Sequence, residues 1–218
     1  MDVGHRGDRG GRAAHPGHPL FAALYDGLTG AFERHLLGPL REELLAGCGG
    51  DVLLIGVGTG ADLAVLSRNR TGPEHPRLWA VDPDPHMLRR ASLRARSLGL
   101  PVEFVEAAAE RLPFPAHSFD HVVTSLVLCS VRDVPRSLAE ARRVLGPAGS
   151  LHFLEHVRAE GQAGRWQDGL RPLWAAVAGG CQLNRATGEE LRQAFGEVRW
   201  REVPLPFPLC RLLLGQAR

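Results

Sequence analysis

The sequence predicts an α/β fold, built on a seven-stranded, mostly parallel sheet with helices on both faces. Short apolar runs alternate with amphipathic stretches along most of the chain, as expected where helices wrap a parallel sheet. The length of 218 residues suits one such domain with a sizeable core. Near the end, two apolar runs flank a short segment with three prolines, and this spacing favours an antiparallel hairpin.

The expected strands are the apolar runs at residues 52–55, 78–81, 102–105, 121–124, 151–154, 198–203 and 210–215. The expected helices carry apolar residues at helical spacing. They cover residues 61–67, 85–98, 135–145, 166–178 and 187–195.

Three segments divide the chain. Residues 1–19 are rich in Gly, His, Arg and Pro without periodicity, which predicts a disordered tail. Residues 20–50 repeat leucine and phenylalanine at helical spacing, so they predict N-terminal helices divided at Pro39. Residues 51–218 then form the main domain.

Composition excludes several kinds of chemistry. The chain has no lysine, so neither a lysine Schiff base nor a phosphate-binding Gly-Lys-Ser/Thr loop can form. A net charge of +2, with arginines spread along the chain, argues against a nucleic-acid partner. The four cysteines form no C-x-x-C pair, so no metal site is expected.

The chain start and the apolar runs bear on location. The first residues are polar and lack the apolar region of a signal peptide. No apolar run is long enough to form an integral membrane segment. We therefore expect a cytoplasmic protein with free thiols, while peripheral membrane contact and oligomeric state stay open.

The most informative segment places three glycines after an apolar strand. Gly56, Gly58 and Gly60 stand at alternate positions and lead into the helix expected from residue 61. Glycine allows a sharp turn and a close approach of a ligand to the backbone, and a helix start favours anionic groups. This G-x-G-x-G spacing differs from the G-x-G-x-x-G of dinucleotide dehydrogenases. A purely structural turn is the alternative.

An acid follows the next strand. Asp82 ends the run 78–81 and lies a little over twenty residues beyond the glycine loop, where a carboxylate can accept hydrogen bonds from the hydroxyls of a ribose. The alternative role for Asp82 is an N-cap of the helix expected at residues 85–98. Asp84 is better placed for that cap, because it directly precedes Pro85.

With these motifs, the sequence resembles the class I S-adenosylmethionine-dependent methyltransferases, which implies a Rossmann-like fold. The resemblance runs from about Leu20 to the end, and each of its motifs is weak alone but strong in this order. The motifs are Ile55-Gly56-Val57-Gly58-Thr59-Gly60, Val81-Asp82-Pro83, Ala109-Glu110-Arg111-Leu112-Pro113-Phe114, Ser118-Phe119-Asp120 and Val144-Leu145-Gly146-Pro147-Ala148-Gly149.

Within this class, the chain looks similar to a small-molecule branch that includes thiol, phospholipid and ubiquinone/menaquinone methyltransferases. The stretches at residues 126–131, 155–157 and 180–185 carry that closer match. The vertebrate thiol enzymes begin with a membrane-anchoring apolar segment. The first residues of this sequence show no such run, so membrane attachment is not among the expectations that the resemblance implies. The resemblance implies a small apolar acceptor, with a thiol favoured over a phenol or quinol.

The resemblance implies S-adenosylmethionine as cofactor and assigns residues to it. The glycine loop would line the methionine part, Asp82 would hold the ribose, and the segment after the fourth strand would floor the methyl-transfer pocket. Tyr25 belongs to the N-terminal helices, which would form a lid over the site. The alternative for Tyr25 is that it is only a half-buried aromatic residue of the core. The full set is Tyr25, Gly56, Val57, Gly58, Thr59, Gly60, Asp82, Pro83, Met87, Ala109, Glu110, Thr124, Ser125 and Leu126.

Two departures from the family pattern concern acids. Leu54 and Ala108 stand where the family commonly has acidic residues. Losing a polar contact at each could weaken cofactor binding by about 1–3 kcal/mol. Asp62, in the first turn of the next helix, is a candidate replacement opposite the methionine ammonium. The departures also keep open a cofactor-binding protein without catalysis, whereas the glycine spacing disfavours a nicotinamide-dependent oxidoreductase.

His156 is the candidate catalytic base. It ends the run expected as the fifth strand, and ligands of open α/β sheets bind at such strand ends. A thiol acceptor needs little base assistance, whereas a hydroxyl needs a base. The alternative is a local structural role for Glu155-His156. Cys129 is expected to be a small buried apolar residue rather than a nucleophile.

Overall fold

The computed structural model describes residues 33–68, 77–177, 180–205 and 211–218. Its strands are β1 Asp51–Ile55, β2 Arg77–Asp82, β3 Val102–Glu106, β4 Phe119–Ser125, β5 Leu145–Val157, β6 Val198–Pro204 and β7 Arg211–Ala217. Its helices are η1 Glu33–Leu37, α2 Gly38–Leu45, α3 Ala61–Arg68, α4 Pro85–Ser97, α5 Val134–Val144, α6 Gly161–Val177 and α7 Thr187–Ala194.

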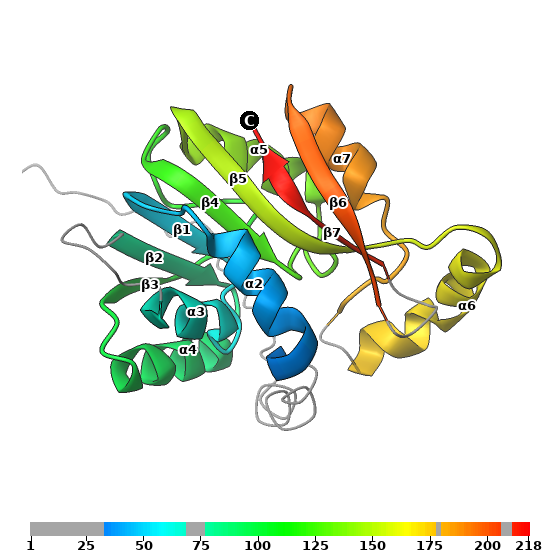
Figure 1. The fold of residues 1–218 in the computed structure, drawn as a ribbon, viewed down its shortest axis with the longest axis horizontal. Coiled ribbons are helices and arrows are strands. Elements are labelled where there is room, and N and C mark those ends of the chain that lie inside the picture. Colours follow the sequence, from blue (N-terminus) through cyan, green and yellow to red (C-terminus); the bar gives the residue numbers. More distant parts are fainter. Residues whose placement is uncertain (1–32, 69–76, 178–179, 206–210) are drawn as a thin grey trace, which may run out of the picture.

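The strands form one seven-stranded sheet in the order β3-β2-β1-β4-β5-β7-β6 (Figure 1). The first five strands of this order pair in parallel. β7 pairs antiparallel with both β5 and β6, which confirms the expected mostly parallel sheet with a C-terminal hairpin. The connection between β6 and β7, and with it the expected strand start at Cys210, lies outside the described residues.

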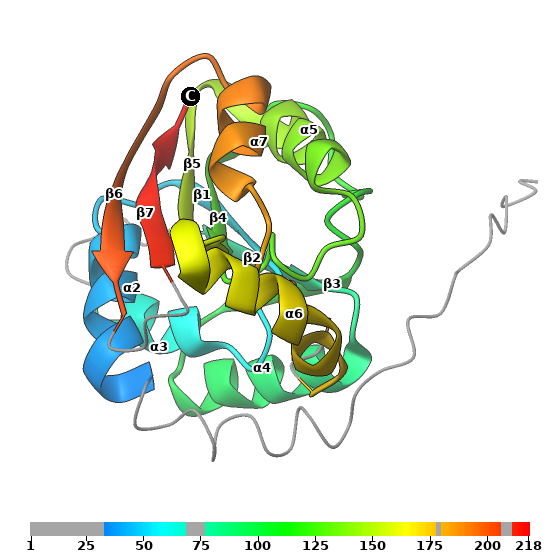
Figure 2. The same cartoon turned by 90° about the vertical axis from the view of Figure 1, so that its right-hand side faces the viewer.

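Helices cover both faces of the sheet (Figures 1 and 2). α2, α3 and α4 pack on one face, in a core cluster with alternate residues of β1 such as Val52 and Leu54. α5 and α7 pack on the other face, in a cluster that includes Leu53 and Ile55. The alternation of neighbouring β1 residues between two buried clusters explains why this strand is apolar at every position from residue 52 to residue 55.

α2 carries the strongest link from the N-terminal helices to the sheet. It begins at Gly38 with Pro39 in its first turn, where a proline needs no intrahelical donor. Arg41 is only 5% exposed, and its Nη1 lies 2.6 Å both from Asp62 Oδ1 on α3 and from Ser125 Oγ at the end of β4. This buried contact therefore joins α2 to the carboxyl end of the sheet.

Most elements lie within three residues of the expected bounds, while β5 and α6 differ more. β5 is longer than the expected run 151–154, because it pairs with β4 on one side and with β7 on the other. α6 begins at Gly161 rather than at residue 166, and it lies beyond the carboxyl end of β5 instead of on a face (Figures 1 and 2). Over the described ranges, no helix combines the length and apolar character needed to cross a membrane.

Candidate cofactor and acceptor site

The glycine loop follows β1, as the sequence predicts. Gly56, Gly58 and Gly60 have φ angles of 64°, 54° and 84°, in the left-handed region that residues with a Cβ rarely adopt. The loop is closed by a hydrogen bond of 2.9 Å from Gly60 N to Val57 O. Thr59, between the last two glycines, is buried.

The three glycines are required for different reasons. A Cβ on Gly56 would lie 2.7 Å from both methyl carbons of Val127, so this glycine lets the loop after β4 approach β1. A Cβ on Gly60 would meet Leu63 at 3.0 Å and Ala91 at 3.3 Å, so it lets α3 and α4 pack closely. Among the described residues, a Cβ on Gly58 would meet only the Gly56 carbonyl at 4.0 Å. The middle of the loop is therefore the part that a ligand can approach.

Asp82 lies at the carboxyl end of β2 and joins that strand to the glycine loop. Its Oδ2 accepts a hydrogen bond of 2.9 Å from Gly58 N, and its Oδ1 accepts one of 2.9 Å from Asp84 N. A carboxylate offers about four acceptor positions, so two backbone bonds are compatible with contacts to ribose hydroxyls. Asp84 caps α4 through a bond of 2.8 Å from His86 N, which confirms its predicted role.

Pro83 and Met87 flank this cap, and both are partly exposed. Across β2, the loop after β3 carries Ala109 and Glu110. Ala109 is buried, whereas the Glu110 carboxylate accepts hydrogen bonds from the backbone of Arg132 at 2.7 Å and of Asp133 at 3.2 Å. The Glu110 carboxylate thus organises the loop before α5, and a role at the adenine edge stays a prediction.

The loop after β4 begins with a strained residue. Leu126 has a φ of 61°, a conformation that costs a residue with a Cβ about 1 kcal/mol or more. Leu126 N donates to Leu154 O at 2.7 Å. Just before it, Thr124 is buried and Ser125 accepts from Arg41. The residues expected to form the floor of the methyl-transfer pocket therefore make a sharp turn at the end of β4, and this turn is hydrogen-bonded to β5.

Glu155 holds this turn in place. Its side chain is fully buried, and its carboxylate accepts from Val127 N at 3.1 Å and from Leu128 N at 3.0 Å. Burial raises the pKa of the Glu155 carboxyl from 4.5 to about 7, although hydrogen bonds from Leu128 and Val127 oppose the rise. The sequence did not single out this role. The available signal was an acid that directly follows the mainly apolar run at residues 151–154.

His156, the next residue, lies beside two cysteines. Its Nδ1 is 3.9 Å from Cys181 Sγ, and the ligand atoms of Cys129, His156 and Cys181 all lie within 4.8 Å of one another. Hydrogen bonding with Cys129 and contact with His156 lower the pKa of Cys181, while the same hydrogen bond and burial raise that of Cys129. Cys129 is buried beside Leu183, as the sequence predicts.

The loop that carries Cys181 is tied to the loop after β4. Gln182 N donates to Cys129 O at 2.8 Å. Arg185 donates from its two terminal nitrogens to Leu128 O and Val131 O, each at 2.6 Å. The Arg185 contacts were not predictable from local sequence patterns, because they join residues more than fifty positions apart.

Two further expectations have different outcomes. Asp62 is buried and paired with Arg41, so nothing supports its replacing the missing acid opposite the methionine ammonium. Tyr25 lies outside the described residues, as does the part of the expected N-terminal lid that precedes residue 33.

Comparison with known proteins identifies the family of the chain. Residues 53–153 match the family model of a methyltransferase domain. The chain is 34% identical over 202 residues to thiol S-methyltransferase TMT1A of Homo sapiens, which covers 88% of this chain and 79% of that protein. The chain belongs to the class I S-adenosylmethionine-dependent methyltransferases. The position of the glycine loop and of Asp82 in this methyltransferase follows the family pattern given above.

A further sequence relative and a solved structure are also similar to this methyltransferase. It is 42% identical over 107 residues to the ubiquinone/menaquinone biosynthesis C-methyltransferase UbiE of Bordetella parapertussis, over 49% of this chain and 41% of that protein. The crystal structure of an S-adenosylmethionine-dependent methyltransferase from Aquifex aeolicus matches with a TM-score of 0.63 at 20% identity, over 92% and 99% of the two chains. At that identity, the structural match shows the shared fold.

We predict that Asp82→Ala weakens binding of S-adenosylhomocysteine by about 30-fold or more, since hydrogen bonds to a charged acceptor are lost. Calorimetric titration measures the affinity. Asp84→Ala is the matched control, and it should lower thermal stability through loss of the cap while keeping the affinity within about threefold. Normal binding by a folded Asp82→Ala protein would contradict the assignment of Asp82 to the ribose. Unfolding of the variant would show that the role of Asp82 is mainly structural.

We also predict a pH dependence of stability that arises at Glu155. Between pH 4.5 and 7 the folded state binds more protons at this carboxyl than the unfolded state, so the free energy of unfolding falls as pH rises through this window. From about pH 5 to about pH 8, wild type should lose roughly 2–3 kcal/mol more than Glu155→Gln. Denaturant unfolding at both pH values measures the difference.

The exposed Glu160, changed to Gln, controls for the loss of a carboxylate as such. Parallel pH profiles for wild type and Glu155→Gln would show that the buried carboxyl does not titrate in this range.

Proposed function

We propose that this methyltransferase transfers a methyl group from S-adenosylmethionine to a small, largely apolar thiol, with phenols and quinols as weaker acceptors. The observation that carries the choice of acceptor is the position of His156. Its Nδ1 faces Cys181, and the neighbouring Glu155 is engaged by the turn after β4 rather than by the imidazole. In the part of the chain that the structure describes, no carboxylate is hydrogen-bonded to the His156 imidazole, which suits an acceptor that ionises readily.

The cofactor would lie over the carboxyl ends of β1 and β2. The open middle of the glycine loop at Gly58 would accommodate the methionine part, and Asp82 would bind the ribose hydroxyls. Pro83, Met87 and Ala109 would border the adenine. The bound cofactor supplies a methyl group already activated by the sulfonium charge, so the protein must mainly align the acceptor and exclude water.

The acceptor would lie over the carboxyl ends of β4 and β5. The floor there is the turn at Thr124, Ser125 and Leu126, held by Glu155. Beyond it lie Cys129, Cys181 and Leu183, which form a small buried cluster of apolar and polarisable side chains. Such a lining favours ligands with few polar groups. The similarity to thiol S-methyltransferases over 88% of the chain supports the same acceptor class.

Two helical segments would cover the acceptor. The N-terminal helices at residues 20–50 would form one lid, anchored by the Arg41 contacts to Asp62 and Ser125. α6 would supply another wall, since large apolar side chains on it are exposed, Trp166 at 65% and Leu173 at 68%. His156 would accept the acceptor proton where the acceptor is a phenol or quinol, while a thiol can lose its proton to water before the transfer.

An acceptor screen with radiolabelled donor tests this proposal. Thiols, phenols, quinols and amines are compared at equal concentration, and thiols should give the highest kcat/KM. His156→Ala should change the thiol rate by less than about threefold, whereas phenol or quinol methylation should fall by about 100-fold. The thiol rate and the phenol or quinol rate are measured in the same His156→Ala protein, so each serves as a control for general damage to the enzyme. Efficient methylation of RNA or protein, with every small molecule refused, would contradict the substrate assignment.

A further inference from the structure

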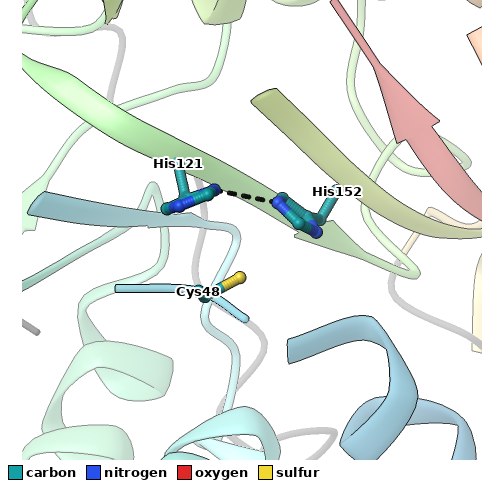
Figure 3. Close-up of side chains that lie close together, drawn as sticks. All are labelled: Cys48, His121 and His152. Atoms are coloured by element: carbon teal, nitrogen blue, oxygen red, sulfur yellow. Dashed lines mark hydrogen bonds between the residues drawn. The ribbon is translucent and has the colours of Figure 1, made fainter. Parts of the chain in front are cut away.

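A second group of ligating side chains lies away from the methyltransferase site. Cys48 precedes β1, His121 is the third residue of β4, and His152 lies in the middle of β5. Their side chains converge from three separate segments, as Figure 3 shows. The candidate thiol sulfur and imidazole nitrogens all lie within 4.8 Å of one another.

The spacing fits a metal ion. His121 Nδ1 and His152 Nε2 face each other at 2.9 Å, and Cys48 points its sulfur toward this pair (Figure 3). Zinc–nitrogen bonds of about 2.0–2.1 Å and zinc–sulfur bonds of about 2.3 Å place tetrahedral donors roughly 3.3–3.6 Å apart. Small side-chain rotations would bring the three donors to that spacing.

We propose that Cys48, His121 and His152 bind a zinc ion through one thiolate and two imidazole nitrogens. This donor set of one soft and two borderline ligands is typical of zinc. Cys48 and His121 are partly exposed while His152 is buried. An ion can therefore enter from the exposed side, and a water molecule can complete the tetrahedron. On binding, the Cys48 thiol loses its proton to solvent.

Gln216 supplies the outer contact that such a site requires. Its side-chain amide lies 3.2 Å from His152 Nδ1, the nitrogen opposite the one that faces His121. An amide can be turned so that its oxygen accepts from Nδ1–H, which frees Nε2 to bind the metal. Histidine ligands commonly carry a hydrogen bond of this kind, and it fixes their tautomer and orientation.

The surroundings suit a structural ion. Arg218 acts on both histidines as a positive charge, while Asp120 acts on His121 and Asp62 acts on Cys48 as negative charges. These charges partly cancel, and the thiolate balances half of the charge of the zinc ion. Cys48 lies before β1 and the glycine loop lies after it, a separation of about 16 Å along the strand. The ion would fasten the turn after α2 to β4 and β5 at the opposite end of these strands from the cofactor.

The group of Cys129, His156 and Cys181 meets the same distance criterion. It lies in the proposed acceptor pocket, and Cys129 is almost fully buried. In the part of the chain that the structure describes, no side-chain amide is hydrogen-bonded to His156 as Gln216 is to His152. This group is therefore the alternative metal site, and the experiment must distinguish it from the proposed one.

Metal-stripped, untagged protein is titrated with cobalt(II) and zinc(II). Wild type should show a thiolate-to-cobalt charge-transfer band that zinc abolishes. Cys48→Ser should lose one bound equivalent and weaken zinc binding by at least about 100-fold. Gln216→Met, which keeps all three ligands, should weaken it by about 10–100-fold. Zinc should raise the melting temperature of wild type by several degrees or more and leave Cys48→Ser unchanged.

The matched control is the double variant Cys129→Ser/Cys181→Ser, which should retain the equivalent that depends on Cys48. The histidines of residues 1–19 carry no thiol nearby in sequence, so their binding of cobalt would give no charge-transfer band. Absence of tight zinc binding, an equivalent that survives in Cys48→Ser, or a band that disappears only in the double variant would each overturn the proposal. Circular dichroism of each variant confirms that losses do not come from unfolding.

Discussion

The carboxylate of Asp82 connects the two strand ends on which the cofactor side of the molecule depends. It accepts the Gly58 N–H of the loop after β1 and the Asp84 N–H of the loop after β2. Glycines with positive φ are conformationally costly to order, and a charged acceptor offsets part of that cost. One acid thus fixes the shape of the glycine loop and, in the proposed function, meets the ribose.

A second buried acid has the corresponding role on the acceptor side. Glu155 accepts consecutive backbone N–H groups from Val127 and Leu128, so the strained turn at Leu126 is held from β5. Val127 in turn lies against Gly56, which brings the two loops into contact. Because burial raises the pKa of the Glu155 carboxyl to about 7, the stability of this side of the site depends on pH near neutrality.

The sequence predicted what depends on local patterns. Apolar runs located all seven strands, the glycine spacing located the loop, and Asp84 before Pro85 was correctly expected to cap α4. Contacts between residues far apart in the chain were not predictable in the same way. Three such contacts depend on how the strands are ordered in the sheet: Arg41 with Asp62, Glu155 with Leu128, and Arg185 with Val131. For the same reason, cysteine spacing alone indicated no metal site, whereas Cys48, His121 and His152 meet only after folding.

The central claim is that the loop after β1 and the acid after β2 form a site for the sulfur nucleoside. Calorimetric titration of the wild-type chain with S-adenosylmethionine, S-adenosylhomocysteine and NAD tests it most directly. We expect both sulfur nucleosides to bind at one site per chain and NAD to give no binding heat, since the spacing is G-x-G-x-G and not that of dinucleotide enzymes. Binding of NAD, with no response to either sulfur nucleoside, would contradict the account.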